Sequence, residues 1–231
     1  MKIDKSLYTK QEFKLIKEQK RKEKNKKKLE NLQHLKPDDD IAFVVGNGKS
    51  RENIDLNNLK KHGIIYGCNA LYRHFSPNFL IAVDVKMVLE INKAGYQNSN
   101  TVWTNPNKAF DRMKNFNYFQ PSKGWSSGPT ALWFAAQKKY KKIYILGFDF
   151  KGLDNGKKFN NIFADTPNYK RSNDGATFFG NWMRQTKTVI NDNPNINFVR
   201  IINDDTYNPE ELMAYKNYYS MEKDFFSNHF M

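Results

Sequence analysis

The chain has 231 residues and a net charge of +14, with 39% hydrophobic residues, 15% aromatic residues and a single cysteine, Cys68. This length suits one α/β domain with an extension, and one cysteine excludes an intrachain disulfide. No apolar run approaches the roughly 20 residues of a membrane span, and the N-terminus lacks the apolar core of a secretory signal. We therefore predict a cytoplasmic protein in a reducing compartment.

Positive charge is concentrated at the N-terminus, where residues 1–36 carry 13 Lys or Arg and 5 Asp or Glu. Residues 6–33 are mostly good helix formers, but residues 17–28 contain no apolar side chain. This pattern predicts a solvated helix or a disordered arm. The arm, taken as residues 1–38, has the charge of a segment that attracts a polyanion. It suits a tail that keeps the protein in solution or docks on a protein partner equally well.

Strands and helices alternate along residues 39–231, the predicted domain. The predicted strands and helices are, in chain order, strand 41–46, helix 56–61, strand 63–69, strand 78–83, helix 85–92, strand 101–104, a helix and then a strand within 106–119, helix 128–139, strand 142–148, strand 196–202 and helix 209–219. This order predicts an open, mostly parallel Rossmann-like α/β sheet with helices on both faces and the first strand near its centre. Residues 151–180 are polar and lack an apolar period, so they are predicted to form a lid-like segment.

The first strand runs directly into the sequence Gly46-Asn47-Gly48-Lys49-Ser50. Two glycines let a chain turn sharply and bring backbone N–H groups close to a ligand, and a helix N-terminus nearby favours phosphate. A plain tight turn explains two glycines equally well. The sequence fails the dinucleotide-binding fingerprint, because Arg51 stands at the third glycine, and fails the P-loop, because Phe43 stands at the first.

Polar residues also follow the other predicted strands: Asn69 the second, Asp84 the third and Asp149 the fifth. In parallel sheets ligands bind at the carboxyl ends of the strands, so these side chains favour a pocket at that edge. Each has an alternative explanation, since Asn69 and Asp84 are also good helix caps. Cys68 is interpreted as a small core residue.

These motifs resemble a known family. In order, Gly46-Asn47-Gly48-x-Ser50, Cys68-Asn69, Ser126-Ser127-Gly128 and the run ending in Gly147-Phe148-Asp149 are similar to the bacterial sialyltransferases of glycosyltransferase family 42. A more distant likeness is to motility-accessory and archaeal pterin pyrophosphokinase proteins, which share the glycine-turn opening. The resemblance covers about residues 41–202 and is most specific in SSGPTALWFAAQKKYKKIYILGFDF.

The resemblance implies a Rossmann-like domain of the GT-A type that takes a CMP-like nucleotide-sugar and an acceptor, without a metal or other cofactor. The sequence itself shows no His, Cys and Asp cluster with metal-ligand spacing. We assign nucleotide-binding roles to residues at the strand and helix ends, namely Gly46, Asn47, Gly48, Ser50, Asn69, Asp84, Ser126, Ser127, Gly128, Gly147 and Asp149.

The chain departs from the family at two points. The family's histidine base has no match in residues 175–186. Lys151 stands at the first of two positions where the family has tyrosines that stabilise the departing phosphate, and Lys157 or Lys158 lies near the second. A lysine suits a phosphate as a point charge. Asp174, or Asp165, is a candidate replacement for the base. We therefore predict Lys151 and Asp174 as catalytic residues.

The function predicted from these residues is a nucleotide-sugar-dependent glycosyltransferase with the donor phosphate at the Gly46–Gly48 turn. Asn47→Ala is then expected to weaken nucleotide binding while leaving stability almost intact. An alternative is a non-catalytic structural or assembly protein that forms oligomers and docks through the basic arm, and the abundance of Lys, Asn, Ile and Phe is typical of AT-rich genomes, viral ones among them. A third reading, a pyrophosphokinase-like enzyme, needs ATP and Mg²⁺ held by acids such as Asp84 and Asp149.

Overall fold

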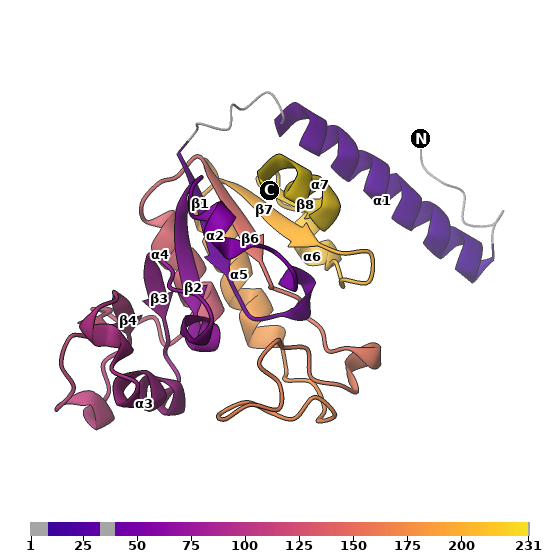
Figure 1. Cartoon of the computed structure of the whole chain (residues 1–231). Helices are drawn as coiled ribbons and strands as arrows, with labels where there is room; N and C mark the ends of the chain where they lie inside the picture. Colours follow the sequence, from indigo (N-terminus) through magenta and orange to yellow (C-terminus); the bar gives the residue numbers. More distant parts are fainter. Residues whose placement is uncertain (1–8, 33–39, 231) are drawn as a thin grey trace. The chain divides into compact units, whose positions relative to one another are not determined.

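The computed structural model describes residues 9–32 and 40–230, and the chain divides into two units, Met1–Pro37 and Asp38–Met231 (Figure 1). In the first unit, α1 (Lys10–Leu32) is a helix. Thr9 and Glu12 exchange hydrogen bonds at its start, with Thr9 N donating to Glu12 Oε2 at 2.8 Å and Glu12 N to Thr9 Oγ1 at 3.3 Å. This capping box is one reason why the helix begins there. Leu15, 60% exposed, shows how little apolar surface the helix buries.

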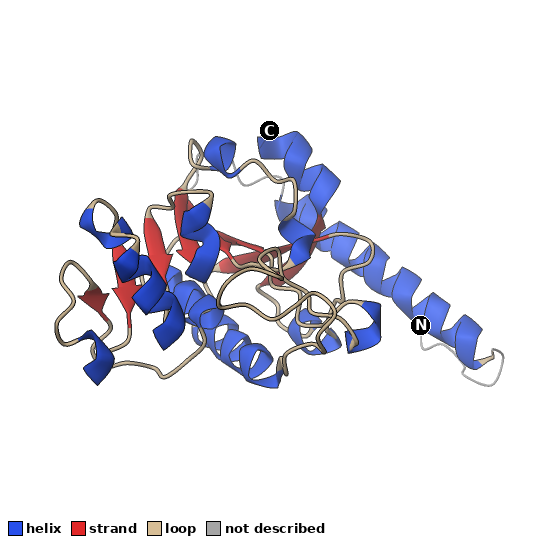
Figure 2. Ribbon diagram, turned by 60° about the horizontal axis from the view of Figure 1, so that its bottom comes forward, coloured by secondary structure: helices blue, strands red, loops and turns tan. Residues whose placement is uncertain are grey.

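Within residues 40–230 the second unit contains an eight-stranded sheet in the order β5-β4-β3-β2-β1-β6-β7-β8, and every neighbouring pair is parallel. Figure 2 shows the strands as one twisted sheet. The strands are β1 (Ile41–Val45), β2 (Ile64–Cys68), β3 (Phe79–Ile81), β4 (Val102–Thr104), β5 (Asn117–Tyr118), β6 (Lys142–Leu146), β7 (Asn197–Ile202) and β8 (Tyr218–Glu222). The prediction of an open parallel sheet with its first strand near the centre is confirmed.

Helices cover both faces of this sheet. They are α2 (Leu56–Leu59), α3 (Val85–Lys93), α4 (Ser127–Ala136), α5 (Gly180–Asp192), α6 (Glu210–Met213) and α7 (Lys223–Phe230), with 3-10 turns η2 (Lys49–Arg51), η3 (Asn69–Arg73), η4 (Tyr96–Asn98), η5 (Lys108–Phe110) and η6 (Asp154–Gly156). Asp55 caps α2 by accepting from Asn57 N and Asn58 N, as its position before the helix predicts.

The all-apolar sequence of β1 follows from burial on both faces, as expected for a central parallel strand. Ala42 and Val44 belong to the core under α4 and α5. Phe43 points the other way, where its ring lies 5.4 Å from the ring of Phe230 and 6.3 Å from that of Phe226, both on α7. Cys68, 2% exposed, is a core residue, and its burial raises the pKa of the thiol to about 12.

The chain adds strands on one side of β1 first and then on the other. From β1 the chain builds outward through β2, β3, β4 and β5 on one side, and through β6, β7 and β8 on the other. The carboxyl ends of β1 and β6 therefore lie at a topological switch point, which is where open α/β sheets place their ligands. The glycine turn follows β1 at this point.

The prediction for the C-terminal part of the chain is wrong. In place of one helix over 209–219, α6 ends at Met213, β8 then pairs with β7, and α7 follows. The strand forms because Tyr218 and Ser220 are buried on one face while tyrosines fit a pleated surface well. The predicted helix within 106–119 is only the 3-10 turn η5, and α4 begins at Ser127, one residue earlier than predicted.

Candidate functional site

The glycine turn after β1 is closed by the chain that follows β6. Gly48 N donates to Gly147 O at 3.0 Å, and Ser50 N donates to Asp149 Oδ2 at 3.1 Å. The Ser50 hydroxyl donates to the other oxygen of the same carboxylate. Asp149 is 6% exposed, so an internal carboxylate occupies the position at η2 that the sequence suggested for a phosphate.

Arg51 completes this arrangement, although in the sequence it stands out only as a mismatch to a fingerprint. Its Nε donates to Gly46 O and its Nη2 donates to Asn47 Oδ1 at 3.3 Å. Desolvation lowers the pKa of the buried guanidinium to about 10. The charges of nearby groups, Cys68, Tyr169 and Asp149 among them, oppose this lowering. Arg51 thereby holds the Gly46 carbonyl and the Asn47 amide in position, and Asp149 is one of the groups whose charge favours its ionised form.

Asn47 is itself buried, with 5% exposure. Its Nδ2 donates to Cys68 O at 3.1 Å, which ties the end of β1 to the end of β2, and lies 3.3 Å from the hydroxyl of Tyr169. This burial removes the reason for expecting that Asn47→Ala leaves stability intact, because that expectation assumed a residue outside the core. Removing this amide leaves buried partners without hydrogen bonds, which costs about 1–3 kcal/mol.

Part of the lid-like segment lies over the glycine turn. Lys49 N donates to Asn160 Oδ1 at 3.0 Å, and Ile162 N donates to Asn47 O at 2.8 Å. The Tyr169 hydroxyl accepts from Ala70 N at 3.4 Å, and desolvation raises its pKa to about 12. We call Gly46–Arg51, Gly147–Asp149 and residues 160–169 together the closed half of the carboxyl edge.

An ion pair between Arg73 on η3 and Glu90 on α3, which we call the clasp, holds the same segment. Arg73 makes two bonds of 2.7 Å to the Glu90 carboxylate, and also donates to Thr166 Oγ1 at 2.8 Å and Pro167 O at 2.9 Å. Desolvation would raise the pKa of Glu90, but hydrogen bonds from Arg73 and its neighbours lower it to about 2. Glu90 is therefore ionised, and the clasp holds at any ordinary pH.

A second group of predicted residues lies beyond β2 and β3. Ser127 Oγ donates to Asn69 Oδ1 at 2.7 Å and accepts from Val83 N at 3.1 Å. Asn69 Nδ2 in turn lies 3.5 Å from Asp84 Oδ2. Asn69 and Ser126 are partly exposed and Asp84 is exposed. We call Asn69, Asp84 and Ser126–Gly128 the open half of the carboxyl edge.

Asp84 does not act as a helix cap, although it stands at the N-cap position of α3, because its side chain makes no capping bond there. The residue is exposed overall, yet enough of its carboxyl group is shielded for desolvation to raise its pKa, against a lowering by the Asn69 amide. A carboxylate with a raised pKa beside polar neighbours is a candidate proton acceptor.

The start of α4 gives the open half its N–H groups. The N-cap residue Ser126 makes no side-chain capping bond, and the first turn holds no acidic residue. Ser126 N donates to Gln185 Oε1 at 3.1 Å, which fixes the helix start against α5. A Cβ at Gly128 would lie 3.1 Å from Phe148 and from Trp182. The helix is thus held in place. The N–H groups of Ser127 and Gly128 have no partner within the helix, and Pro129 in the same turn has no N–H.

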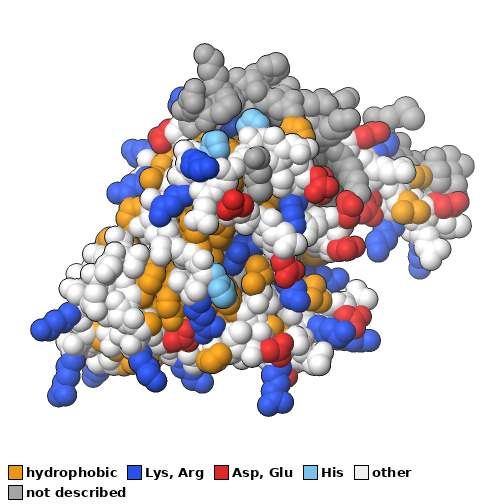
Figure 3. All heavy atoms as spheres, viewed as in Figure 1, with side chains coloured by type: hydrophobic (Ala, Val, Ile, Leu, Met, Phe, Trp, Pro, Cys, Tyr) orange, Lys and Arg blue, Asp and Glu red, His pale blue; other side chains and the backbone are white. Residues whose placement is uncertain are grey.

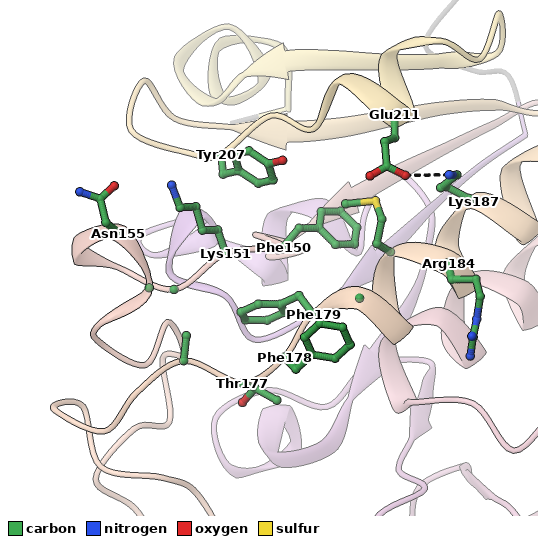
Figure 4. A pocket seen from close by; sticks show the side chains of 15 residues that line it. Phe150, Lys151, Asn155, Thr177, Phe178, Phe179, Arg184, Lys187, Tyr207 and Glu211 are labelled. Carbon is green, nitrogen blue, oxygen red and sulfur yellow. Dashed lines mark hydrogen bonds and ion pairs between the residues drawn. The ribbon is translucent and has the colours of Figure 1, made fainter.

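The predicted catalytic residues lie outside both halves. Lys151 is exposed, and its Nζ lies 5.5 Å from the centre of the Tyr207 ring, in a cavity that Figure 4 shows. Asp174 is exposed and accepts from Arg171 N at 2.8 Å within its own turn. Asp165, the alternative base, lies within the closed half. It accepts from Ser172 N at 3.0 Å, and this bond lowers its pKa, which weakens it as a base.

Metal-binding clusters and membrane spans are both missing from the described residues. In residues 9–32 and 40–230, no three His, Cys, Asp or Glu side chains come close enough to hold a metal ion, and no helix is long and apolar enough to cross a membrane. Figure 3 shows Lys and Arg side chains spread over the face in view.

Comparisons with known proteins identify no relative. No protein-family model, no curated protein and no solved structure matches the chain. The resemblance to family 42 therefore stays a prediction, and the geometry of the carboxyl edge is what supports a function.

Proposed function

We propose that the protein is a nucleotide-sugar-dependent glycosyltransferase of sialyltransferase-like type whose donor binds in the open half. The observation that carries the proposal is that predicted residues from separate parts of the sequence meet at the carboxyl edge of a parallel sheet, the edge at which such folds bind ligands. Asn69, Asp84, Ser127 and Asp149 come from four separate parts of the sequence and all lie at this one edge.

The N-terminus of α4 is the better position for the donor phosphate. The N–H groups of Gly48, Lys49 and Ser50 already donate to protein oxygens. By contrast, the first turn of α4 has no capping side chain and no acidic residue, and a helix N-terminus favours an anion. The closed half would then shape the site and hold Asn69 in position, without touching the phosphate.

The chemistry follows from these positions. The acceptor hydroxyl would attack the anomeric carbon of the donor sugar, its proton would pass to the Asp84 carboxylate, and the nucleotide would leave with the electrons of the broken bond. Asp84 suits this role better than Asp174, because its pKa is raised and it lies beside Asn69. General-base catalysis of this kind contributes about 10²–10⁴-fold to a rate.

Titration calorimetry with CMP, UDP and GDP tests the proposal. Wild-type protein should bind one of them, and Asn69→Gly should weaken that binding by about 1–3 kcal/mol. Glycine is chosen because Asn69 has φ +50°, which alanine tolerates poorly. Asn191→Ala is the control, since Asn191 is exposed on α5 and donates to its neighbour Asp192. The absence of binding by any of the three nucleotides would contradict the proposal.

The second candidate is a non-catalytic structural or assembly protein, and one observation favours it. The internal Asp149 carboxylate fills the anion position of the glycine turn, as expected for a turn that has only a structural role. This candidate predicts no nucleotide affinity, and salt-dependent capture of a polyanion or protein by the basic arm. The same titration separates the two candidates.

A further inference from the structure

A cavity of about 460 Å³ lies between the start of the lid-like segment and the start of α5. Its walls are rich in aromatic side chains, and Figure 4 shows Phe150, Phe178, Phe179 and Tyr207 facing it. Phe178 is 80% exposed and Tyr207 44% exposed. The volume is that of a small-molecule site, and such sites combine apolar walls with a few placed polar groups.

The charged groups of this cavity are mostly basic. Lys187 Nζ and Glu211 Oε2 form an ion pair of 2.7 Å, which is neutral as a whole. Lys151 and Arg184 line the cavity as well. In Figure 4 the Lys151 ammonium points toward Tyr207, while the Arg184 side chain extends away from the aromatic side chains and donates to Asn181 Oδ1 at 3.1 Å. The lining therefore has an excess of positive charge.

The N-terminus of α5 opens into the same cavity, since Gly180 is one of its lining residues. The helix has 13 residues, its N-cap residue Phe179 makes no capping bond, and its first turn holds no acidic side chain. Its first N–H groups have no partner within the helix, and its dipole adds positive potential at this end. A helix end of this kind binds oxyanions.

Arg200 on β7 is an independent sign that an anion belongs here. Its side chain is fully buried, its guanidinium lies 5.1 Å from the centre of the Phe150 ring, and its Nη2 donates to Tyr207 O at 2.8 Å. Phe150 and Tyr207 both line the cavity, and Arg200, which contacts both of them, is not itself a lining residue. Among the residues that the structure describes, Nε and Nη1 of Arg200 have no hydrogen-bond partner.

A buried charge without a counter-charge is costly. The ring of Phe150 offsets part of this cost through a cation–π contact, but a ring does not accept hydrogen bonds from two guanidinium nitrogens. An anion in the cavity would lower the remaining electrostatic cost, because Arg200 contacts two residues of the cavity wall, Phe150 and Tyr207. The positive helix end, Lys151 and Arg200 therefore favour the same kind of ligand.

We propose that this cavity binds a phosphate monoester of a small ring compound, with the phosphate at the N-terminus of α5 beside Lys151 and the ring against Phe179 and Tyr207. A lysine meets a phosphate as a point charge. This inference does not depend on the proposed glycosyltransferase activity, since the cavity and the open half are lined by different residues.

Titration calorimetry on the full chain with glucose 6-phosphate and phenyl phosphate tests the inference, with glucose, phenol and inorganic phosphate for comparison. At least one ester should bind saturably and about tenfold more tightly than its neutral parent. It should also bind more tightly than inorganic phosphate, because the ring contacts the aromatic wall. Failure of both esters to bind, or equal binding of ester and parent, would overturn the inference. Equal binding of ester and inorganic phosphate would overturn the role of the ring.

The variants separate binding from folding. Asn181→Asp places a carboxylate in the first turn of α5, where it favours the helix dipole and so preserves or raises the melting temperature, yet it should weaken ester binding by about fivefold. Lys151→Met should weaken binding by about tenfold, and Lys157→Met, in the same segment but not among the cavity's lining residues, should not. Arg200→Met should also weaken binding if it folds. Unchanged binding by both Asn181→Asp and Lys151→Met would refute the inference.

Discussion

Asn47 and Asn69 follow neighbouring strands of one sheet, but their surroundings differ. Asn47 is 5% exposed and is surrounded by Arg51, Cys68 and Tyr169. Asn69 is partly exposed, and its amide lies beside Ser127 and Asp84 at the sheet's rim. The comparison teaches that a polar residue at a strand end serves the fold where its partners are internal, and remains accessible from solvent where part of it lies at the rim.

The largest loss of stability is expected from Asp149→Ala in the closed half. The substitution leaves the Ser50 N–H and hydroxyl without an acceptor and removes the negative charge that balances Arg51. The free energy of unfolding should fall by about 2–4 kcal/mol, as for loss of a buried charged partner. Urea denaturation measures this. A fall smaller than that of Asp174→Ala, a change at an exposed carboxylate, would contradict the structural role of the closed half.

Gly48→Ala is expected to have the next largest effect. A Cβ at this position would lie 2.5 Å from the Asp149 carboxylate and 2.8 Å from Gly147 O, so the turn must open to accept it. Such overpacking costs about 1–3 kcal/mol. Gly175→Ala is the matched control, because a Cβ added there would have no atom within 4 Å and the φ of Gly175 is not positive. Equal melting temperatures for the two variants would show that the turn is not tightly packed.

Asn47→Ala and Asn69→Gly together test the difference between the closed half and the open half directly. Asn47→Ala should lower the free energy of unfolding by about 1–3 kcal/mol, because its buried partners lose their hydrogen bonds. Asn69→Gly should lower it by less than about 1 kcal/mol, since water replaces the lost partner at a partly exposed site. Chemical denaturation of both variants measures the difference, and the reverse order would remove the distinction between the two halves.

The smallest expected effect is a difference between wild-type protein and Asp84→Asn in how the stability of the fold depends on pH. The folded-state pKa of Asp84 is raised by desolvation, so its protonated form favours the folded state. The corresponding stability is present below the unfolded pKa and is lost as the pH rises through the folded pKa. Relative to Asp84→Asn, wild-type protein should therefore lose a little stability as the pH rises past the ordinary Asp pKa of about 3.9. Thermal unfolding of both proteins at pH values below and above this pKa measures the loss, and parallel curves would exclude a raised pKa.

The fold was predictable from the sequence because its main signals are local. The run IAFVV before Gly46 indicated a central parallel strand, and the polar residues at later strand ends indicated the carboxyl edge. The edge strand β8 was not predicted, because the local pattern around α6 is typical of a helix. The strand forms through pairing with β7, an interaction that the local pattern does not contain. Local pattern alone does not decide between a short helix and an edge strand.

The division of the candidate site into two halves was not predictable. It depends on bonds between residues far apart in the chain, such as Lys49 N to Asn160 Oδ1 and Asn47 Nδ2 to the Tyr169 hydroxyl. Asn160 and Tyr169 lie in a polar segment without periodicity, so nothing in their immediate sequence distinguishes them. Arg51 was visible only as a residue that breaks a fingerprint, whereas its role comes from burial against Gly46 and Asn47.

Backbone amide NMR during a CMP titration tests the central claim most directly, because it reports on both halves at once. The claim that the open half takes the nucleotide phosphate predicts the largest shifts at Asn69, Ser127 and Gly128. Smaller shifts are expected at Gly48 and Ser50, whose N–H groups already donate to Gly147 and Asp149. Shifts centred on Gly48 and Ser50, with Asn69 and Ser127 unchanged, would contradict the account.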